Sequence, residues 1–225
     1  MHHTPLPALR VWDLPTRIFH WTLSVCVIGL FISAKMGGAA MAWHFYLGYS
    51  VLTLLLFRLL WGVFGGYWSR FSTFLYSPLT LLRFLQGQRR PEYQVGHSPL
   101  GALSVWALLG FLAVQVGTGL VSDDEIANSG PLSRFVSNAV VNLATWYHKE
   151  AGQFILLGLV LLHLLAVTFY TLKKRQKLVA SMIHGHKQVS VKLPASRDDT
   201  ASRLLSVFLL LSCAALVFWL IKKVS

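Results

Sequence analysis

Two histidines lie in one long apolar stretch of the chain, WYHKEAGQFILLGLVLLHLLAVTFY, which covers residues 146–170. His148 stands near its start, and His163 stands fifteen residues later. In a straight α-helix this spacing corresponds to about 22 Å along the axis and about 60° around it. Both side chains can therefore face one side of the helix at two depths. Ionisable residues are costly in an apolar environment and usually have a function there.

Three further histidines, His20, His44 and His97, stand at or near the ends of other apolar stretches. If these stretches cross a membrane in alternation, His44 falls at the level of His148. By the same reasoning His20 falls at the level of His163. Two levels, each with histidines from two helices, suit two stacked six-coordinate haems, because an imidazole fills each axial position. For any single histidine the alternative is a hydrogen bond to a neighbouring carbonyl, and His97 remains a rival ligand at the level of His163.

Small and cationic residues near these histidines extend the candidate site. Gly48 and Gly152 each follow a histidine by four residues. They therefore lie one turn away on the same face, where a missing side chain leaves room for a flat porphyrin. Arg17 and Arg58 lie near the ends of apolar stretches and are candidates to hold haem propionates. For Arg58 the alternative is that the charged end of its side chain reaches the membrane surface.

Other cofactor chemistries find no matching motif. The chain has two cysteines, Cys26 and Cys213, and no C-x-x-C-H sequence, so neither covalent c-type haem nor an iron–sulfur centre is expected. The sequence H-E-x-x-H of zinc proteases is also absent. Non-covalent haem is therefore the cofactor that the histidines predict.

The composition indicates the elements that must position these residues. Hydrophobic residues make up 55% of the 225 residues and charged residues only 12%, against roughly 25% charged residues in a soluble domain. Five apolar stretches approach the roughly 20 residues that cross a bilayer. These are Ile18–Ala34, Ala42–Phe64, Pro99–Val121, Ala151–Leu172 and Leu204–Ile221. The sequence thus predicts an all-α integral membrane protein with helices spanning the bilayer.

The net charge of +12 is distributed as in a membrane protein rather than as in a nucleic-acid binder. Most lysines and arginines precede the first stretch, or lie between the second and third and between the fourth and fifth. Positive charge marks the cytoplasmic side, so we predict a cytoplasmic N-terminus. The opposite side carries the acidic run Asp123, Asp124 and Glu125. Lys222 and Lys223 fit the orientation of the fifth span poorly.

The segments between the spans also have recognisable patterns. FSTFLYSPLTLLRFLQG, within residues 65–97, predicts a short helix on the inner membrane surface. GPLSRFVSNAVVNLATW, before residue 147, predicts another interfacial helix on the outer side. Residues 191–203 are polar and read as a linker to a separate C-terminal helix, 204–225.

Several segments occur in the order typical of one protein family. They are VWDLPTRIFHW, HFYLGYSVLTLLLFRLLWG, RFSTFLYSPLTLLRFLQG, GHSPLGALSVWALLG, YHKEAGQFILLGLVLLHLLAV and LVASMIHGHK. Over roughly residues 10–190 the chain resembles the bacterial di-haem cytochrome b561 family, which includes the cytochrome b subunits of nickel–iron hydrogenases. The resemblance implies a four-helix transmembrane bundle in residues 1–190 that binds two b-type haems. The implied ligand pairs are His44 with His148, and His20 with His163.

The resemblance also implies a role in the bacterial inner membrane. Electrons would pass between a periplasmic redox partner, a hydrogenase or a c-type cytochrome, and membrane quinone. His97 and Ser98 are candidate quinone contacts, and the alternative for them is the start of a helix before Pro99. The family commonly has G-H-N-P where this chain has Gly-His-Ser-Pro at residues 96–99. The asparagine amide is thus missing from that segment, so the quinone type stays open.

Two other functions remain open from the sequence. The chain could act alone as an enzyme that oxidises superoxide or another small reductant and reduces quinone. It could also be a haem-free transporter or interaction subunit. The direction of electron flow, the role of the fifth helix and homo-oligomer formation also stay open. Beyond lipid, quinone and a redox protein, no nucleic-acid partner is expected.

Overall fold

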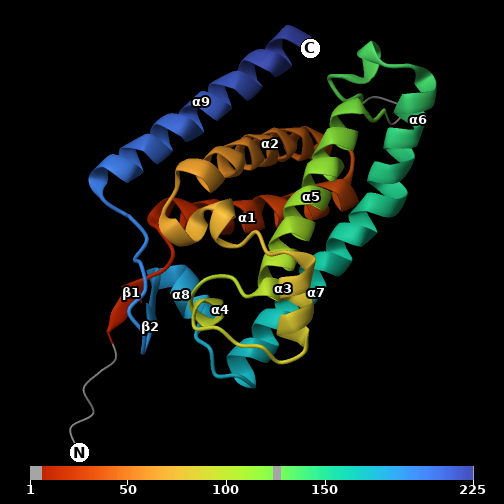
Figure 1. Ribbon diagram of the computed structural model, residues 1–225. Helices are drawn as coiled ribbons and strands as arrows, with labels where there is room; N and C mark the ends of the chain where they lie inside the picture. Colours follow the sequence, from red (N-terminus) through yellow and green to blue (C-terminus); the bar gives the residue numbers. More distant parts are fainter. Residues whose placement is uncertain (1–6, 124–127, 225) are drawn as a thin grey trace, which may run out of the picture. The chain divides into compact units, whose positions relative to one another are not determined.

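A computed structural model describes residues 7–123 and 128–224 (Figure 1). Asp124 and Glu125 of the predicted acidic run lie outside these residues. Within them, five helical segments are long and apolar enough to cross a membrane. They are α1 (Leu14–Met36), α2 (Ala40–Phe64), α5 (Pro99–Val121), the continuous segment Asn138–Leu172, and α9 (Thr200–Val224). The predicted all-α membrane fold is confirmed.

Helix α1 begins four residues before the apolar stretch that predicted it. Asp13 Oδ1 accepts a hydrogen bond from the backbone N–H of Thr16 at 2.8 Å, which caps the first turn. Pro15 lies in that turn, where its missing N–H costs nothing. The polar residues of the first turn thus belong to the helix because a side chain satisfies its free backbone donors.

The fourth span is longer than predicted. Helix α6 (Asn138–Trp146), the π-helical turn η4 (Tyr147–Gly152) and α7 (Gln153–Leu172) form one segment of 35 residues. The predicted outer interfacial helix therefore leads directly into the membrane span. His148 lies in the π-helical turn, so the angle of about 60° expected between His148 and His163 in a straight α-helix does not apply.

Short elements connect the long helices. The predicted surface helix is present as α3 (Pro78–Leu85), and Ser77 Oγ caps it by accepting from Thr80 N–H at 3.2 Å. The other short elements are η1 (Tyr67–Ser69), η2 (Phe71–Thr73), α4 (Glu92–Val95), η3 (Ser133–Phe135) and α8 (Leu178–His184).

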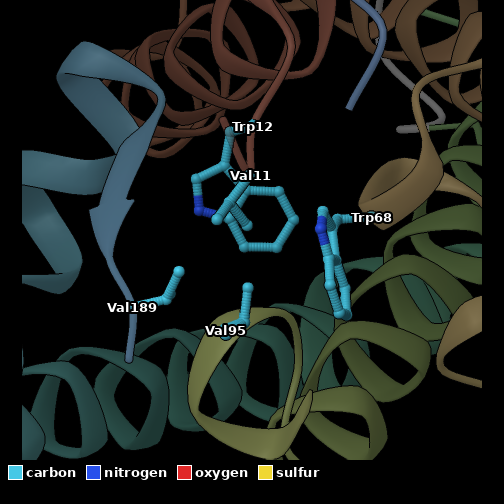
Figure 2. Packing of buried hydrophobic residues seen from close by; sticks show 5 residues of the cluster. All are labelled: Val11, Trp12, Trp68, Val95 and Val189. Atoms are coloured by element: carbon cyan, nitrogen blue, oxygen red, sulfur yellow. The ribbon is translucent and has the colours of Figure 1, made fainter. Parts of the chain in front are cut away.

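A two-stranded antiparallel sheet joins distant parts of the chain. β1 (Ala8–Arg10) pairs with β2 (His186–Gln188), with Leu9 opposite Lys187. Gly185 ends α8 at a φ of +85°, a conformation that favours glycine. Beside the sheet the side chains of Val11, Trp12, Trp68, Val95 and Val189 converge in a buried apolar cluster (Figure 2).

The chain divides into two compact units. Unit 1 comprises residues 1–19, 58–106 and 163–207, and unit 2 comprises residues 20–57, 107–162 and 208–225. The sheet and the cluster in Figure 2 belong to unit 1.

The polar segment predicted as a linker packs within unit 1. Ser196 Oγ donates to Val11 O at 2.6 Å and accepts from Trp68 N–H at 3.2 Å. Arg10 forms an ion pair with Asp198. The segment is thus bound to the N-terminal strand, and α9 begins at Thr200, four residues before the predicted span.

Candidate functional site

His44 and His148 lie close together in unit 2. Their ring centroids are 6.1 Å apart, and the ring planes are nearly perpendicular at 86°. His44 comes from the first turns of α2, and His148 comes from the π-helical turn η4. The two histidines predicted to share one level therefore meet in the structure.

The end of α1 orients the His44 ring. His44 Nδ1 lies 3.2 Å from Leu30 O and 3.3 Å from Ser33 Oγ. Ser33 Oγ in turn donates to Gly29 O at 2.8 Å. A neutral imidazole that donates from Nδ1 carries its lone pair on Nε2. These contacts thus leave Nε2 as the coordinating atom of His44.

Helix α5 orients the His148 ring in the same way. His148 Nδ1 lies 2.9 Å from Gln115 O, and Gln115 Nε2 donates to His148 O at 3.0 Å. A methyl group added to Gly119 would approach His148 Cε1 to 2.8 Å, so the ring lies directly against the backbone of α5. His148 thus also presents Nε2 as an available lone pair.

These residues fit an iron porphyrin. With about 2 Å from metal to each nitrogen, an iron between two imidazoles separates the ring centroids by roughly 6 Å, and the observed separation is 6.1 Å. Metal-binding histidines commonly donate their other ring N–H to a carbonyl, as both do here. Among the described residues, no group of three or more His, Cys, Asp or Glu side chains could hold a metal ion. A pair of histidines suits a cofactor that brings its own equatorial ligands.

The two candidate glycines have different surroundings. A methyl group at Gly48 would meet no atom within 4 Å, so space is open beside it. A methyl group at Gly152 would instead approach Gln115 Oε1 to 2.0 Å and Tyr147 Cε1 to 2.6 Å. Gly152 therefore allows η4 to pack closely against α5, while Gly48 has room for a flat ring.

The other predicted pair belongs to two different units. His20 lies in unit 2, with its ring centroid 5.1 Å from that of Trp21. His163 lies in α7 within unit 1. Their pairing around a second haem stays a prediction from the sequence.

A buried carboxylate organises unit 1. Asp13 is fully buried and accepts from Trp61 Nε1 at 3.0 Å, from Gly66 N–H at 3.1 Å and from Ser69 Oγ at 2.6 Å. Together with the cap on Thr16, its two oxygens receive four hydrogen bonds. Four donors on one carboxylate hold the start of α1, the end of α2 and η1 together.

The two candidate arginines both lie in unit 1. Arg58 is 4% exposed, donates from Nη2 to Ser69 O at 3.0 Å, and places its guanidinium 4.5 Å from the ring centroid of Phe71. Its Nη1 is buried and has no hydrogen-bond partner among the described residues. Arg17 donates from Nη1 to Ile183 O, and its buried Nε has no partner in the described part of the chain. Their contact with haem propionates stays a prediction.

His97 is enclosed by aromatic rings. Its ring centroid lies 4.9 Å from that of Trp12 and 4.4 Å from that of Phe74. Burial, with smaller effects of the Arg58 and Lys187 charges, lowers the pKa of His97 to about 3. His97 is therefore neutral at physiological pH.

Ser98 occupies the start of α5. Its Oγ accepts a hydrogen bond from Gly101 N–H at 3.2 Å, as a residue before a helix commonly does. The helix-start alternative for Ser98 is thus realised in the structure. Its hydroxyl hydrogen stays available to a ligand oxygen, because the hydroxyl serves Gly101 only as an acceptor.

The sequence reasoning did not identify the residues that orient the two histidines. Gln115 could have been identified from the sequence, since it is an amide within an otherwise apolar stretch. Ser33 and Gly119 had none, because serine and glycine are frequent in membrane helices. Asp13 lay outside every apolar stretch and was also missed.

Comparisons with known proteins agree with this geometry. The model of one family, described as prokaryotic cytochrome b561, matches residues 11–185. A probable Ni/Fe-hydrogenase B-type cytochrome subunit of Bradyrhizobium diazoefficiens is 24% identical, over 81% of this chain and 87% of that protein. Proteins of the same description from Cupriavidus necator and Azotobacter vinelandii are 25% and 26% identical, over 81% and 79% of this chain and 88% of each relative. No solved structure matches the chain significantly.

Proposed function

Because the chain belongs to the prokaryotic cytochrome b561 family, we propose that it passes electrons between a periplasmic redox protein and membrane quinone. It is a multi-pass bacterial membrane protein and a b-type cytochrome of electron transport. The arrangement of His44 and His148 carries the proposal, because it combines two imidazoles at the spacing of axial ligands with a carbonyl contact on each Nδ1.

The residues around the pair have clear tasks in electron transfer. A bound haem supplies a one-electron redox centre. His44 and His148 would hold this haem, each through the lone pair of its imidazole Nε2. Leu30 O and Gln115 O orient the rings and increase their basicity by accepting the Nδ1 hydrogens. A site of this kind exchanges electrons with little rearrangement of ligands.

A second haem between His20 and His163 is part of the proposal. The family resemblance and the matched levels of the two histidines in the sequence support it. Two redox centres at two depths would let electrons cross the roughly 30 Å hydrocarbon core in steps. The cytochrome would then connect a protein at one membrane face with a carrier dissolved in the bilayer.

The partner at the outer face is proposed to be a hydrogenase-like redox protein. The curated relatives are described as probable B-type cytochrome subunits of Ni/Fe-hydrogenases. The distribution of lysines and arginines supports a cytoplasmic N-terminus, which places His44 and His148 toward the periplasm. His97 and Ser98 are the proposed contacts of quinone on the other side.

The proposal is tested on the purified chain in detergent. We expect a reduced-minus-oxidised absorption spectrum of b-type haem, and two haems per polypeptide by quantitation of extracted haem. Reduction of the haem by a soluble short-chain ubiquinol would support exchange with quinone. A colourless preparation, or one that binds less than one haem per chain after haem supplementation, would contradict the proposal.

A further inference from the structure

Six buried side-chain atoms in the described part of unit 1 have no hydrogen-bond partner, and three of them border one group of aromatic rings. These three are Arg58 Nη1, Trp106 Nε1 and His97 Nδ1. Buried polar groups in native proteins nearly always have a partner. Arg58 is 4% exposed, so water has little access to its side chain. Three such atoms in one region indicate a bound molecule that supplies the missing partners.

The three atoms belong to one group of aromatic rings. The Arg58 guanidinium lies 4.5 Å from the Phe71 centroid, and the Phe71 centroid lies 4.7 Å from that of Trp106. The Phe74 centroid lies 6.0 Å from that of Trp106 and 4.4 Å from that of His97. These three unpartnered atoms thus lie around one pair of phenyl rings, Phe71 and Phe74.

The kinds of atom define the ligand. An arginine Nη and the tryptophan Nε1 can only donate hydrogen bonds, and the His97 ring can donate or accept. The ligand must therefore offer acceptor oxygens. Aromatic neighbours favour a flat ring, since such rings stack edge to face or offset at these distances.

The charge balance favours a neutral ligand. Arg58 Nη2 donates to Ser69 O, and Ser69 Oγ donates to the Asp13 carboxylate, so Ser69 bridges the buried cation and a buried anion. The guanidinium therefore already has a counter-charge within unit 1. Because Asp13 already balances Arg58, the guanidinium needs only a hydrogen-bond acceptor, and a carbonyl oxygen supplies one without adding a charge.

We propose that Arg58 and Trp106 donate hydrogen bonds to a carbonyl oxygen of a quinone ring held against Phe71 and Phe74. This rests on the proposed function and names the residues that recognise the quinone. His97 borders the same ring group, and its Nδ1 is available to the second carbonyl or to the hydroxyl of a quinol. Arg58 is a positioning residue as well, because it also holds η1 through Ser69 O.

The test compares Trp106→Phe and Arg58→Gln with the unchanged chain. Trp106→Phe keeps an aromatic ring and removes only the N–H donor. Trp219→Phe is the matched control, since Trp219 lies on α9 and is 55% exposed. The measurements are the KM and kcat for haem reduction by a soluble short-chain ubiquinol, and the haem content and spectrum of each preparation.

We expect Trp106→Phe to raise the KM about tenfold, the size of one lost hydrogen bond to a buried group, with haem content and spectrum unchanged. Arg58→Gln should raise it further, and Trp219→Phe should have no effect. An unchanged KM in Trp106→Phe would overturn the inference. So would a loss of haem at unchanged KM in both variants, because it would assign these donors to a propionate. An unchanged chain that binds haem but is not reduced by ubiquinol would instead reject the quinone part of the proposed function.

Discussion

The imidazoles of His44 and His148 lie 6.1 Å apart and nearly perpendicular, and the Nδ1 atom of each lies within hydrogen-bond distance of a carbonyl of another helix. The carbonyls belong to Leu30 near the end of α1 and to Gln115 in α5. Three helices and the π-helical turn therefore cooperate to hold one pair of ligands. This dependence on neighbouring helices leads to predictions that concern residues other than the histidines.

Gly119→Ala should weaken binding of the haem proposed between His44 and His148 about 10- to 100-fold, the range for residues that orient metal ligands. The added methyl group would lie 2.8 Å from His148 Cε1 and displace the ring. Gly117→Ala is the control, because it lies on the same helix and its methyl group would meet nothing within 4 Å. Titration of the haem-depleted proteins with haem measures the affinities. Equal affinities in the two variants would contradict this account of α5.

Gly48→Leu should prevent binding of the haem proposed between His44 and His148, because its side chain would fill the open space beside Gly48. A methyl group at Gly48 meets no protein atom within 4 Å, so the first carbon of the new side chain fits the chain's own packing. Gly110→Leu tests the same change at an exposed glycine of α5 that is also free of neighbours. Quantitation of extracted haem should show a loss in the first variant alone. Full haem content in Gly48→Leu would show that the porphyrin lies elsewhere.

The spans were predictable because the bilayer demands long apolar stretches, and all five are helices in the structure. Their ends were less predictable, since they depend on particular side chains. α1 extends to Leu14 because Asp13 caps it. The fourth span reaches back to Asn138 through a π-helical turn that leaves no hydrophobic signature. Pairing of β1 with β2 joins residues about 180 positions apart, and strands of three residues carry no signal of such pairing.

The sequence predicted that His44 and His148 lie at one level, because each is an ionisable residue at a similar depth in an apolar helix. The residues that orient them depend on which carbonyl faces which ring, and this follows from the packing of helices rather than from residue type. The unpartnered donors of Arg58 and Trp106 were not foreseen, because nothing in the sequence shows that a buried atom lacks a partner.

Asp13→Asn should destabilise the protein by about 3 kcal/mol, because four donors and a buried guanidinium lose their anionic partner. Its carboxylate accepts from Thr16, Trp61, Gly66 and Ser69. Asp199→Asn is a matched control, since its side chain is 55% exposed and pairs with Arg197 at the surface. Thermal unfolding in detergent should show a lower midpoint for the first variant only. Equal midpoints would mean that the carboxylate does not hold unit 1 together.

Stability should fall as the pH decreases below the ordinary pKa of histidine, about 6.5. Burial lowers the pKa of His97 to about 3, so the unfolded chain binds a proton that the folded chain does not. Each pH unit between these two values costs about 1.4 kcal/mol for this group. Above the pKa of the unfolded chain, His97 is neutral in both the folded and the unfolded state, so this cost disappears.

The check is the unfolding midpoint between pH 4.5 and 7.5 for the unchanged chain and for His97→Gln. The variant should depend less on pH, while His186→Gln, at an exposed histidine of β2, should behave as the unchanged chain. The same slope in all three proteins would show that His97 does not contribute.

The pairing of His44 with His148 is tested most directly by single changes of each to alanine. The measurement is the reduced-minus-oxidised spectrum together with the haem content of the two purified variants. We predict that each loses the same spectral component and that the remaining component is identical in both. Loss of different components in the two variants, or retention of full haem content in either, would contradict the pairing.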